Sequence, residues 1–147
     1  MKLNLLFLIF FTLFTQINLS QGTRVLRNPD LSDNHITFTY ASDIWIVNKS
    51  GGLAKRITST PAVENDPYFS PNGKWLAFTS NRTGVNNAYI VPISGGTPTQ
   101  LTWHPSGSTV RGWSPDGKSL LISSRRNTAP RSYNKLYSLH IDGGLPE

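Results

Sequence analysis

The segment FSPNGKWLAFTS at residues 69–80 combines turn-forming residues with an apolar run that is typical of a β-strand. Its Ser-Pro-Asn-Gly segment is typical of a tight turn, because proline presets the backbone angle at the turn corner and glycine accepts the positive φ that other residues avoid. The apolar, aromatic-rich run from Trp75 to Phe78 follows directly. Such a run favours a β-strand that is covered on both faces. The stretch therefore predicts a turn that leads into a buried strand.

The surrounding residues complete one structural unit. A second strand is expected over residues 88–93, and it ends at Ser94-Gly95-Gly96, where the chain reverses. A shorter outer strand is expected over residues 98–101, since a proline at its start suits a sheet edge. Residues 66–69, before the turn, are expected to form the short innermost strand. Four antiparallel strands in this order make one propeller blade.

The unit recurs along the chain. WSPDGKSLLISS at residues 113–124 repeats it closely, and LSDNHITF at residues 31–38 is a more divergent copy. The glycine pairs that begin at Gly51, Gly95 and Gly143 lie 44 and then 48 residues apart, a spacing typical of propeller blades. The sequence predicts an all-β, incomplete β-propeller of about three four-stranded antiparallel blades at residues 29–60, 61–104 and 105–147.

Three blades leave two apolar sheet faces open. Closed propellers have at least four blades, and the end units of an open stack need polar outer faces. The first copy instead carries Ile44, Trp45 and Ile46, and the last carries Leu136 and Tyr137. We therefore expect the native protein to continue past residue 147 or to complete its blades as a homo-oligomer.

Residues 1–20 have the layout of a secretory signal peptide: a basic start, an apolar segment over residues 3–14 and the small Ser20 before a cleavage site. Twelve helical residues span about 18 Å at 1.5 Å each, which is short of the roughly 30 Å of a bilayer core. We expect a signal-peptide helix, a linker at residues 21–28, no stable membrane anchor, and an exported protein that is periplasmic or secreted.

Composition excludes several functions. The 147 residues contain no cysteine, so disulfides, thiolate metal sites and cysteine nucleophiles are absent. The net charge of +6 comes from scattered cations, which favours a solvated surface over a nucleic-acid partner. The histidines, His35, His104 and His140, have no metal-ligand spacing, and His104 fits a turn.

No catalytic, cofactor-binding or metal residue is expected. Ser106 and Ser108 flank a turn glycine, and no Gly-x-Ser-x-Gly motif is present. Four aspartates at repeat-related positions are expected to bond local backbone amides: Asp43, Asp66, Asp116 and Asp142. Among the tryptophans that offer stacking surfaces, Trp45, Trp75, Trp103 and Trp113, the repeat positions of Trp75 and Trp113 favour core packing. Arg111 and the pair Arg125-Arg126 are candidates for meeting peptide carboxylates at a channel mouth; substrate-binding residues are otherwise unknown.

The repeat resembles that of TolB-type propellers: Phe-Ser-Pro-Asx-Gly-Lys, then Ala-Phe-Thr-Ser-Asn-Arg, Tyr-Ile-Val, Gly-Gly and Leu-Thr. The linked order of DIWIV (43–47), LTWHP (101–105), VRGWSPDGK (110–118) and LHIDGGLPE (139–147) is similar to the N-terminal propeller of tricorn-type serine peptidases. The resemblance covers nearly everything after residue 20. Asn72 stands where the repeat usually has aspartate, and both tolerate the same turn geometry.

This resemblance implies a large peptidase in which two propellers precede a PDZ module and a C-terminal serine peptidase domain. The first propeller, with six blades, gates or channels peptides, and the catalytic residues lie in the C-terminal half, so none is carried over to this chain. The implied partners are peptides or proteins and the rest of the peptidase. The family archetype is cytoplasmic, which is the alternative to export.

Three functions remain open. The first is the gating front of an exported tricorn-type peptidase, and the second is a non-enzymatic TolB-like propeller that serves as a periplasmic protein-binding scaffold. The third is a propeller fused to an amidohydrolase. For all three, the isolated chain is expected to show no peptide hydrolysis.

Overall fold

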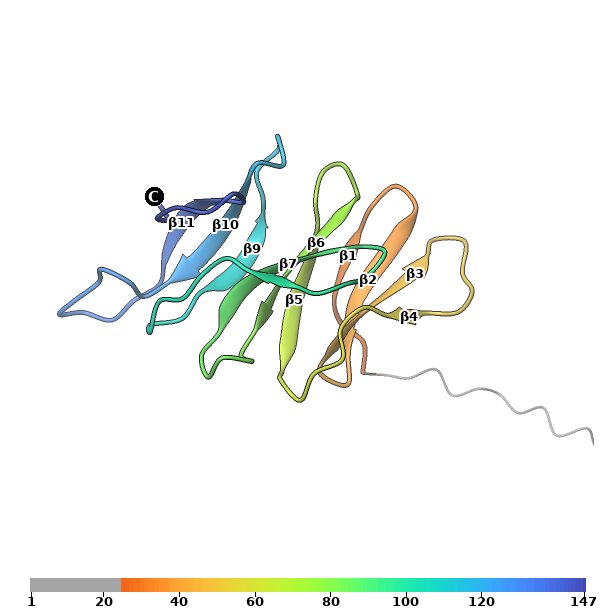
Figure 1. Cartoon of the computed structure of the whole chain (residues 1–147), viewed down its shortest axis with the longest axis horizontal. Coiled ribbons are helices and arrows are strands. Elements are labelled where there is room, and N and C mark those ends of the chain that lie inside the picture. Colours follow the sequence, from red (N-terminus) through yellow and green to blue (C-terminus); the bar gives the residue numbers. More distant parts are fainter. Residues whose placement is uncertain (1–24) are drawn as a thin grey trace, which may run out of the picture.

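A computed structural model describes residues 25–147. Every regular element in this part of the chain is a β-strand (Figure 1). The expected signal peptide at residues 1–20 lies outside the described residues, as does the first half of the expected linker, residues 21–24. Within residues 25–147 no helix is long and apolar enough to cross a membrane.

Three antiparallel sheets follow one another along the chain, and each pairs only strands that are neighbours in sequence. Blade 1 contains β1 (Arg27–Leu31), β2 (His35–Tyr40), β3 (Asp43–Asn48) and β4 (Lys55–Arg56). Blade 2 contains β5 (Glu64–Phe69), β6 (Trp75–Ser80), β7 (Asn87–Pro92) and β8 (Thr99–Gln100). Blade 3 contains β9 (Thr109–Trp113), β10 (Ser119–Ser124) and β11 (Lys135–His140). The all-β class and the arc of three blades are confirmed.

Blade 3 differs from the expected four strands. Its sheet has three strands, and the place of the fourth is taken by one residue pair, in which the backbones of Ser138 and Glu147 exchange hydrogen bonds of 2.8 and 2.9 Å. Ser138 corresponds by register to Ile46 of blade 1, which pairs with Lys55 in β4. Glu147 therefore occupies the first position of an outer strand.

The predicted turn is present between β5 and β6. Gly73 has a φ of +65°, and its amide donates to the carbonyl of Ser70 at 2.8 Å. The Asn72 side chain accepts from the Lys74 amide at 3.0 Å, and the Ser70 hydroxyl accepts from the Trp75 amide at 3.0 Å. Blade 3 repeats these bonds with Asp116 in place of asparagine. We call the turn between the first and second strands of a blade its inner turn. The inner turns of the three blades, between β1 and β2, β5 and β6, and β9 and β10, lie in a row along the upper edge of Figure 1.

The core consists of two layers, one between each pair of blades. We call the side of a blade that faces the preceding blade its backward face and the opposite side its forward face. The first layer packs the forward face of blade 1 against the backward face of blade 2; its members are Ile44, Ile46, Ile57, Phe69, Leu76, Phe78, Tyr89 and Val91. The second packs blade 2 against blade 3 in the same way; its members are Ala77, Ala88, Ile90, Leu101, Val110, Leu120, Ile122 and Leu139. Blade 2 is thus covered on both faces, as its apolar run indicated.

Of the two tryptophans that were expected in the core, Trp75 and Trp113, one is partly buried and the other is exposed. Trp113 packs against the second core layer and donates its indole N–H to the carbonyl of Tyr68 at 3.0 Å. Trp75 is 37% exposed, because it begins β6 beside the turn and pairs with Pro92 at the end of β7, so its expected core position is wrong. Trp103 is exposed, and Trp45 packs edge-on against Tyr40 on the backward face of blade 1.

Candidate functional site

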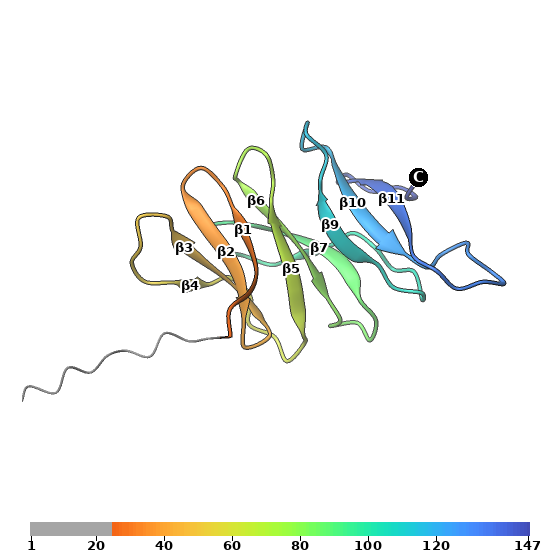
Figure 2. The same ribbon diagram turned by 180° about the vertical axis from the view of Figure 1, so that it is seen from behind.

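The innermost strands of the three blades lie side by side. β5 contacts both β1 and β9, so the strands that begin the blades form one continuous surface (Figure 2). In a propeller, blades are arranged radially around a central channel. We call this the inner-strand surface and define it by five residues with polar side chains: Asn28, Asp30, Asp66, Tyr68 and Arg111.

Matching bulges shape this surface in blades 1 and 2. The pairing of β1 with β2 skips residues between Arg27 and Asp30, and the pairing of β5 with β6 skips residues between Asn65 and Tyr68. The skipped residues include Asn28 and Asp66, whose φ angles of +49° and +52° are left-handed. Asparagine and aspartate tolerate this region better than other side-chain residues. Bulges re-aim side chains and are frequent next to functional sites.

The two bulge residues are joined across the blades. The Asn28 amide nitrogen donates to an Asp66 carboxylate oxygen at 2.5 Å. Beside them, Asp30 at the end of β1 accepts a 2.7 Å hydrogen bond from the backbone amide of Phe69. Side chains of blade 1 therefore hold the inner strand of blade 2 in place.

Charges of both signs meet at Tyr68. Burial raises the pKa of its hydroxyl above the ordinary 10.0, and the Asp66 carboxylate raises it further. The Arg111 guanidinium acts in the opposite direction, and Asp30 adds a smaller upward effect on the pKa. Arg111 is exposed and is held by a 2.9 Å bond from its Nε to the Ser123 hydroxyl. At neutral pH the surface offers a phenol donor, two carboxylates and a guanidinium.

Replacing Asp66 with asparagine is expected to lower the pKa of Tyr68, because the charge of the Asp66 carboxylate favours the neutral phenol. The phenolate absorbance difference between each protein and its Tyr68→Phe counterpart isolates this titration from that of the other tyrosines. Because the pKa of Tyr68 is higher in the folded protein than in the unfolded one, its neutral hydroxyl contributes to folding stability at pH values below the unfolded pKa. This contribution is lost as the pH rises through the folded-state pKa. An unchanged Tyr68 titration in the Asp66→Asn variant would contradict the proximity of these groups.

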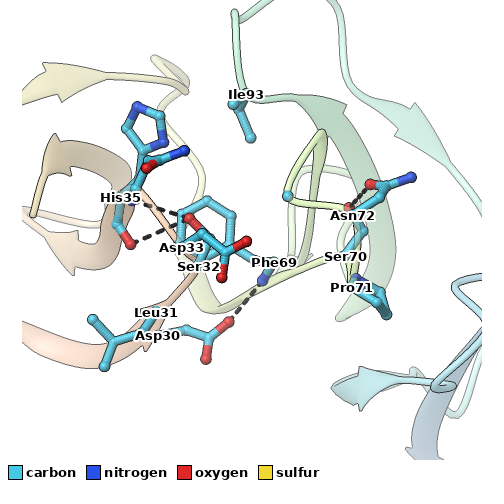
Figure 3. Close-up of a pocket in the computed structure, with 12 residues that line it drawn as sticks. Asp30, Leu31, Ser32, Asp33, His35, Phe69, Ser70, Pro71, Asn72 and Ile93 are labelled. Carbon is cyan, nitrogen blue, oxygen red and sulfur yellow. Dashed lines mark hydrogen bonds between the residues drawn. The ribbon is translucent and has the colours of Figure 1, made fainter.

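A pocket of ≈ 450 Å³ opens where the inner strands end, between the inner turns of blades 1 and 2. Figure 3 shows Asp30 bonded to the backbone of Phe69 at its floor, with Ser32 bonded to His35 on one wall and Ser70 to Asn72 on the other. The Ser32 hydroxyl accepts from the His35 amide at 3.1 Å. Asp30, Ser32 and Ser70 are thus already hydrogen-bonded, and the pocket lies at the rim of the inner-strand surface.

The two arginines of the candidate Arg125-Arg126 pair differ in their exposure to solvent. Arg125 is exposed, whereas Arg126 is 7% exposed and donates to the hydroxyls of Ser108 and Ser124 at 2.9 and 3.3 Å. Burial lowers the pKa of its guanidinium. Arg126 is therefore structural, and Ser108, expected in a plain turn, is instead a buried acceptor. Of the candidate arginines, only Arg111 lies on the inner-strand surface.

The aspartates follow the expectation only in part. Asp116 bonds the Lys118 amide at 3.0 Å, as expected. Asp43 instead pairs with Arg56 at 2.6 Å, because the partner strand β4 places a guanidinium beside it. Asp66 bonds Asn28, and Asp142 lies 3.5 Å from His140.

No three histidine, aspartate or glutamate side chains gather in residues 25–147 as a metal site would require. His104 caps its turn by accepting from the Ser106 amide at 3.1 Å, which is the expected turn role.

Comparison with known proteins identifies the family. The tricorn protease N-terminal beta propeller domain matches residues 23–147, which is every blade described above. This chain belongs to that family. The resemblance inferred from the repeat order is therefore confirmed, and the three blades belong to a tricorn-type propeller.

Individual relatives match shorter segments. Tricorn protease homolog 1 of Streptomyces coelicolor is 35% identical over 60 residues, which is 41% of this chain and 6% of the relative. The Tol-Pal system protein TolB of Bordetella pertussis is 41% identical over 49 residues, 33% of this chain and 11% of the relative. The crystal structure of the tricorn protease superposes with a TM-score of 0.65 at 28% identity, covering 80% of this tricorn-family chain and 12% of that one. The chain thus spans a small part of these relatives.

Proposed function

We propose that this chain is the N-terminal propeller region of an exported tricorn-like serine peptidase, in which it admits or channels peptides and takes no part in the hydrolysis. The family match over residues 23–147 supports the peptidase setting. The observation that carries the peptide-handling role is the inner-strand surface, where exposed Arg111 lies near Asp66 and Asp30 around Tyr68.

The chemistry of that surface suits an extended peptide. Backbone amides and carbonyls of a peptide need donors and acceptors, and its termini need opposite charges. Tyr68 supplies a neutral donor, the aspartates accept, and Arg111 is a guanidinium for a carboxylate. The same groups lack a nucleophile–base pair, so the hydrolysis is assigned to the peptidase domain, with a second propeller and a PDZ module as further partners.

Binding of peptides to the purified chain tests this role. Isothermal titration with unstructured peptides of six to twelve residues (roughly 20–40 Å when extended) is expected to show binding that weakens by about tenfold in Arg111→Ala, because a charged hydrogen bond contributes about 1.5–3 kcal/mol. Asp66→Asn tests the acidic side of the surface. Leu53→Ala, at a 99% exposed loop position away from this surface, is the matched control and should leave binding unchanged.

Mass spectrometry of the peptides after titration completes the experiment. The peptides should be recovered intact. Hydrolysis by the purified chain, or affinity that is equal in the parent and the Arg111→Ala protein, would refute the proposal.

Export is part of the proposal and rests on the basic start and apolar segment of residues 1–20. Fractionation of an expressing diderm bacterium is expected to give periplasmic protein with an N-terminus near Gln21. Protein that stays in the cytoplasm with an intact N-terminus would support the cytoplasmic alternative.

A second function is a non-enzymatic TolB-like scaffold that binds envelope proteins in the periplasm. The 41% identity to TolB over 49 residues favours it. It predicts stable capture of a folded envelope protein and no affinity for short unstructured peptides. The two functions thus give opposite results in the titration above.

A further inference from the structure

The pocket between the inner turns of blades 1 and 2 has an apolar lining that the core supplies. Its volume is ≈ 450 Å³, and both of its walls come from blades that pack on each other within residues 25–147. Phe69, which is 7% exposed, belongs to the first core layer, and the half-buried Ile93 packs against that layer. Both side chains line the pocket. The pocket thus offers a sheltered apolar surface where the inner strands end.

The charged groups that line this pocket are carboxylates. Asp30 accepts the hydrogen bond from the Phe69 amide through Oδ2, which leaves its Oδ1 without a donor among the described residues. Asp33 is exposed in the inner turn of blade 1. The lining residues, all in the described part of the chain, include no lysine or arginine. Figure 3 shows the ring of His35, the remaining titratable residue, on the opposite side of the view from the Asp30 carboxylate. The pocket therefore suits a cation.

We propose that the pocket binds a primary ammonium group of a peptide, supplied by its N-terminus or by a lysine side chain. An ammonium group has three N–H donors for the carboxylates of Asp30 and Asp33, and the carbons attached to it can pack on Phe69 and Ile93. A calcium ion would need six to eight oxygen ligands, whereas no three acidic or histidine side chains gather in residues 25–147. The inference rests on the proposed function, because it assigns a position within the same bound peptide.

The pocket and Arg111 lie on opposite sides of the strand that carries Tyr68. This strand, β5, lies between β1 and β9 and contacts both (Figure 2). Asp30 bonds it from the side of blade 1, and Trp113 bonds the Tyr68 carbonyl from the side of blade 3 at 3.0 Å. A peptide that crosses β5 therefore meets carboxylates at one end and a guanidinium at the other. An N-terminal amine in the pocket and a carboxylate at Arg111 give the bound peptide one direction.

Isothermal titration of the purified protein with three versions of one unstructured peptide tests the proposal. The first has a free N-terminal amine and no lysine, the second is the same peptide with an acetylated N-terminus, and the third is acetylated and contains one lysine. The parent should bind the first or the third about three- to fivefold more tightly than the second, which is the scale of an ion pair near a surface. Tighter binding of the first identifies the N-terminal amine as the ligand, and tighter binding of the third identifies the lysine side chain.

Substitutions in the pocket locate the site of this preference. Asp33→Asn and Asp30→Asn should each reduce the preference for an amine, and the double variant should abolish it, while affinity for the acetylated peptide without lysine stays the same. Asparagine at position 30 keeps an oxygen that can accept from the Phe69 amide, and circular dichroism establishes that the variants are folded. Asp142→Asn is the matched control, because it removes the same charge from a side chain that is 85% exposed and outside the pocket. It should keep the preference.

Equal affinity of the parent for all three peptides overturns the inference. A preference that persists in the double variant, or that Asp142→Asn reduces just as much, overturns it too. In each of these cases the proposed function stands if Arg111→Ala still weakens peptide binding, so the two failures are distinguishable. A parent protein that binds none of the peptides overturns both.

Discussion

Replacing Arg82 with methionine is expected to lower the free energy of unfolding by about 3–5 kcal/mol, because it leaves a buried carboxylate without its counter-charge. Glu64 is fully buried and pairs with the Arg82 guanidinium. Among the described residues the only other hydrogen bond to the Glu64 carboxylate comes from the Thr60 hydroxyl at 3.1 Å, and its Oε2 has no partner. Arg82 is itself 20% exposed and lies 4.5 Å from the ring centroid of Tyr89, so methionine loses this contact too.

Blade 3 supplies the matched control for this prediction. Arg126 occupies the position of Arg82, but Ser108 stands where blade 2 has Glu64, so its partners are hydroxyls. Arg126→Met should cost about 1–2 kcal/mol, since no buried charge is left behind. Urea denaturation of both variants measures the difference. The explanation is wrong if the two substitutions cost the same, or if Glu64→Leu fails to recover stability in the Arg82→Met background.

Replacing Phe78 with alanine is expected to cost about 3–5 kcal/mol, as large-to-small changes of a buried aromatic side chain do. Phe78 is fully buried in the first core layer, between blades 1 and 2, and stacks on Tyr89 with ring centroids 5.7 Å apart. The substitution removes contacts between blades as well as within one, so it tests whether the blades stabilise each other. Urea or thermal denaturation gives the value.

Leu53→Ala is the control for Phe78→Ala. Leu53 is 99% exposed in the loop between β3 and β4, and surface substitutions usually stay within about 0.5 kcal/mol. If Phe78→Ala lowered the free energy of unfolding no more than Leu53→Ala does, the core layer between blades 1 and 2 would contribute little to stability. The stacked arrangement would then not be the source of stability.

The repeat predicted the blades because turn chemistry and strand patterning are local. The Ser-Pro-Asn-Gly segment fixes its own hydrogen bonds within five residues, and the apolar run after it is buried wherever a neighbouring sheet covers both faces. The position of Trp75 was missed because exposure at a strand end depends on the length of the partner strand, which ends at Pro92.

The inner-strand surface was only partly predictable. Arg111 was singled out from sequence, but the pairing of Asn28 with Asp66 joins residues 38 apart through two bulges, and neither bulge has a periodic signal. The repeated Asx-Pro at Asn28-Pro29 and Asp66-Pro67 was the available clue, since a residue before proline has a restricted backbone. Blade 3 lacks this dipeptide and carries Gly112 at its own bulge.

The burial of Arg126 and Ser108 was also beyond local patterns. Nothing near either residue distinguishes it from a surface turn, and the contact depends on the loop after β10 folding back over the connector from blade 2. The equivalent pair in blade 2, Arg82 and Glu64, is a salt bridge. Both blades therefore place an arginine and a polar partner here, but the partner is charged in blade 2 and a neutral hydroxyl in blade 3.

Peptides that carry a photo-activatable cross-linking group show which strands of the propeller bind a peptide, because the covalent products report where the peptide lay. We expect cross-links, mapped by mass spectrometry, to concentrate on β1, β5 and β9, which hold Asp30, Tyr68 and Arg111. Cross-links that fall mainly on the outer strands β4 and β8, or that scatter over all strands, would contradict the assignment of peptide handling to the inner-strand surface.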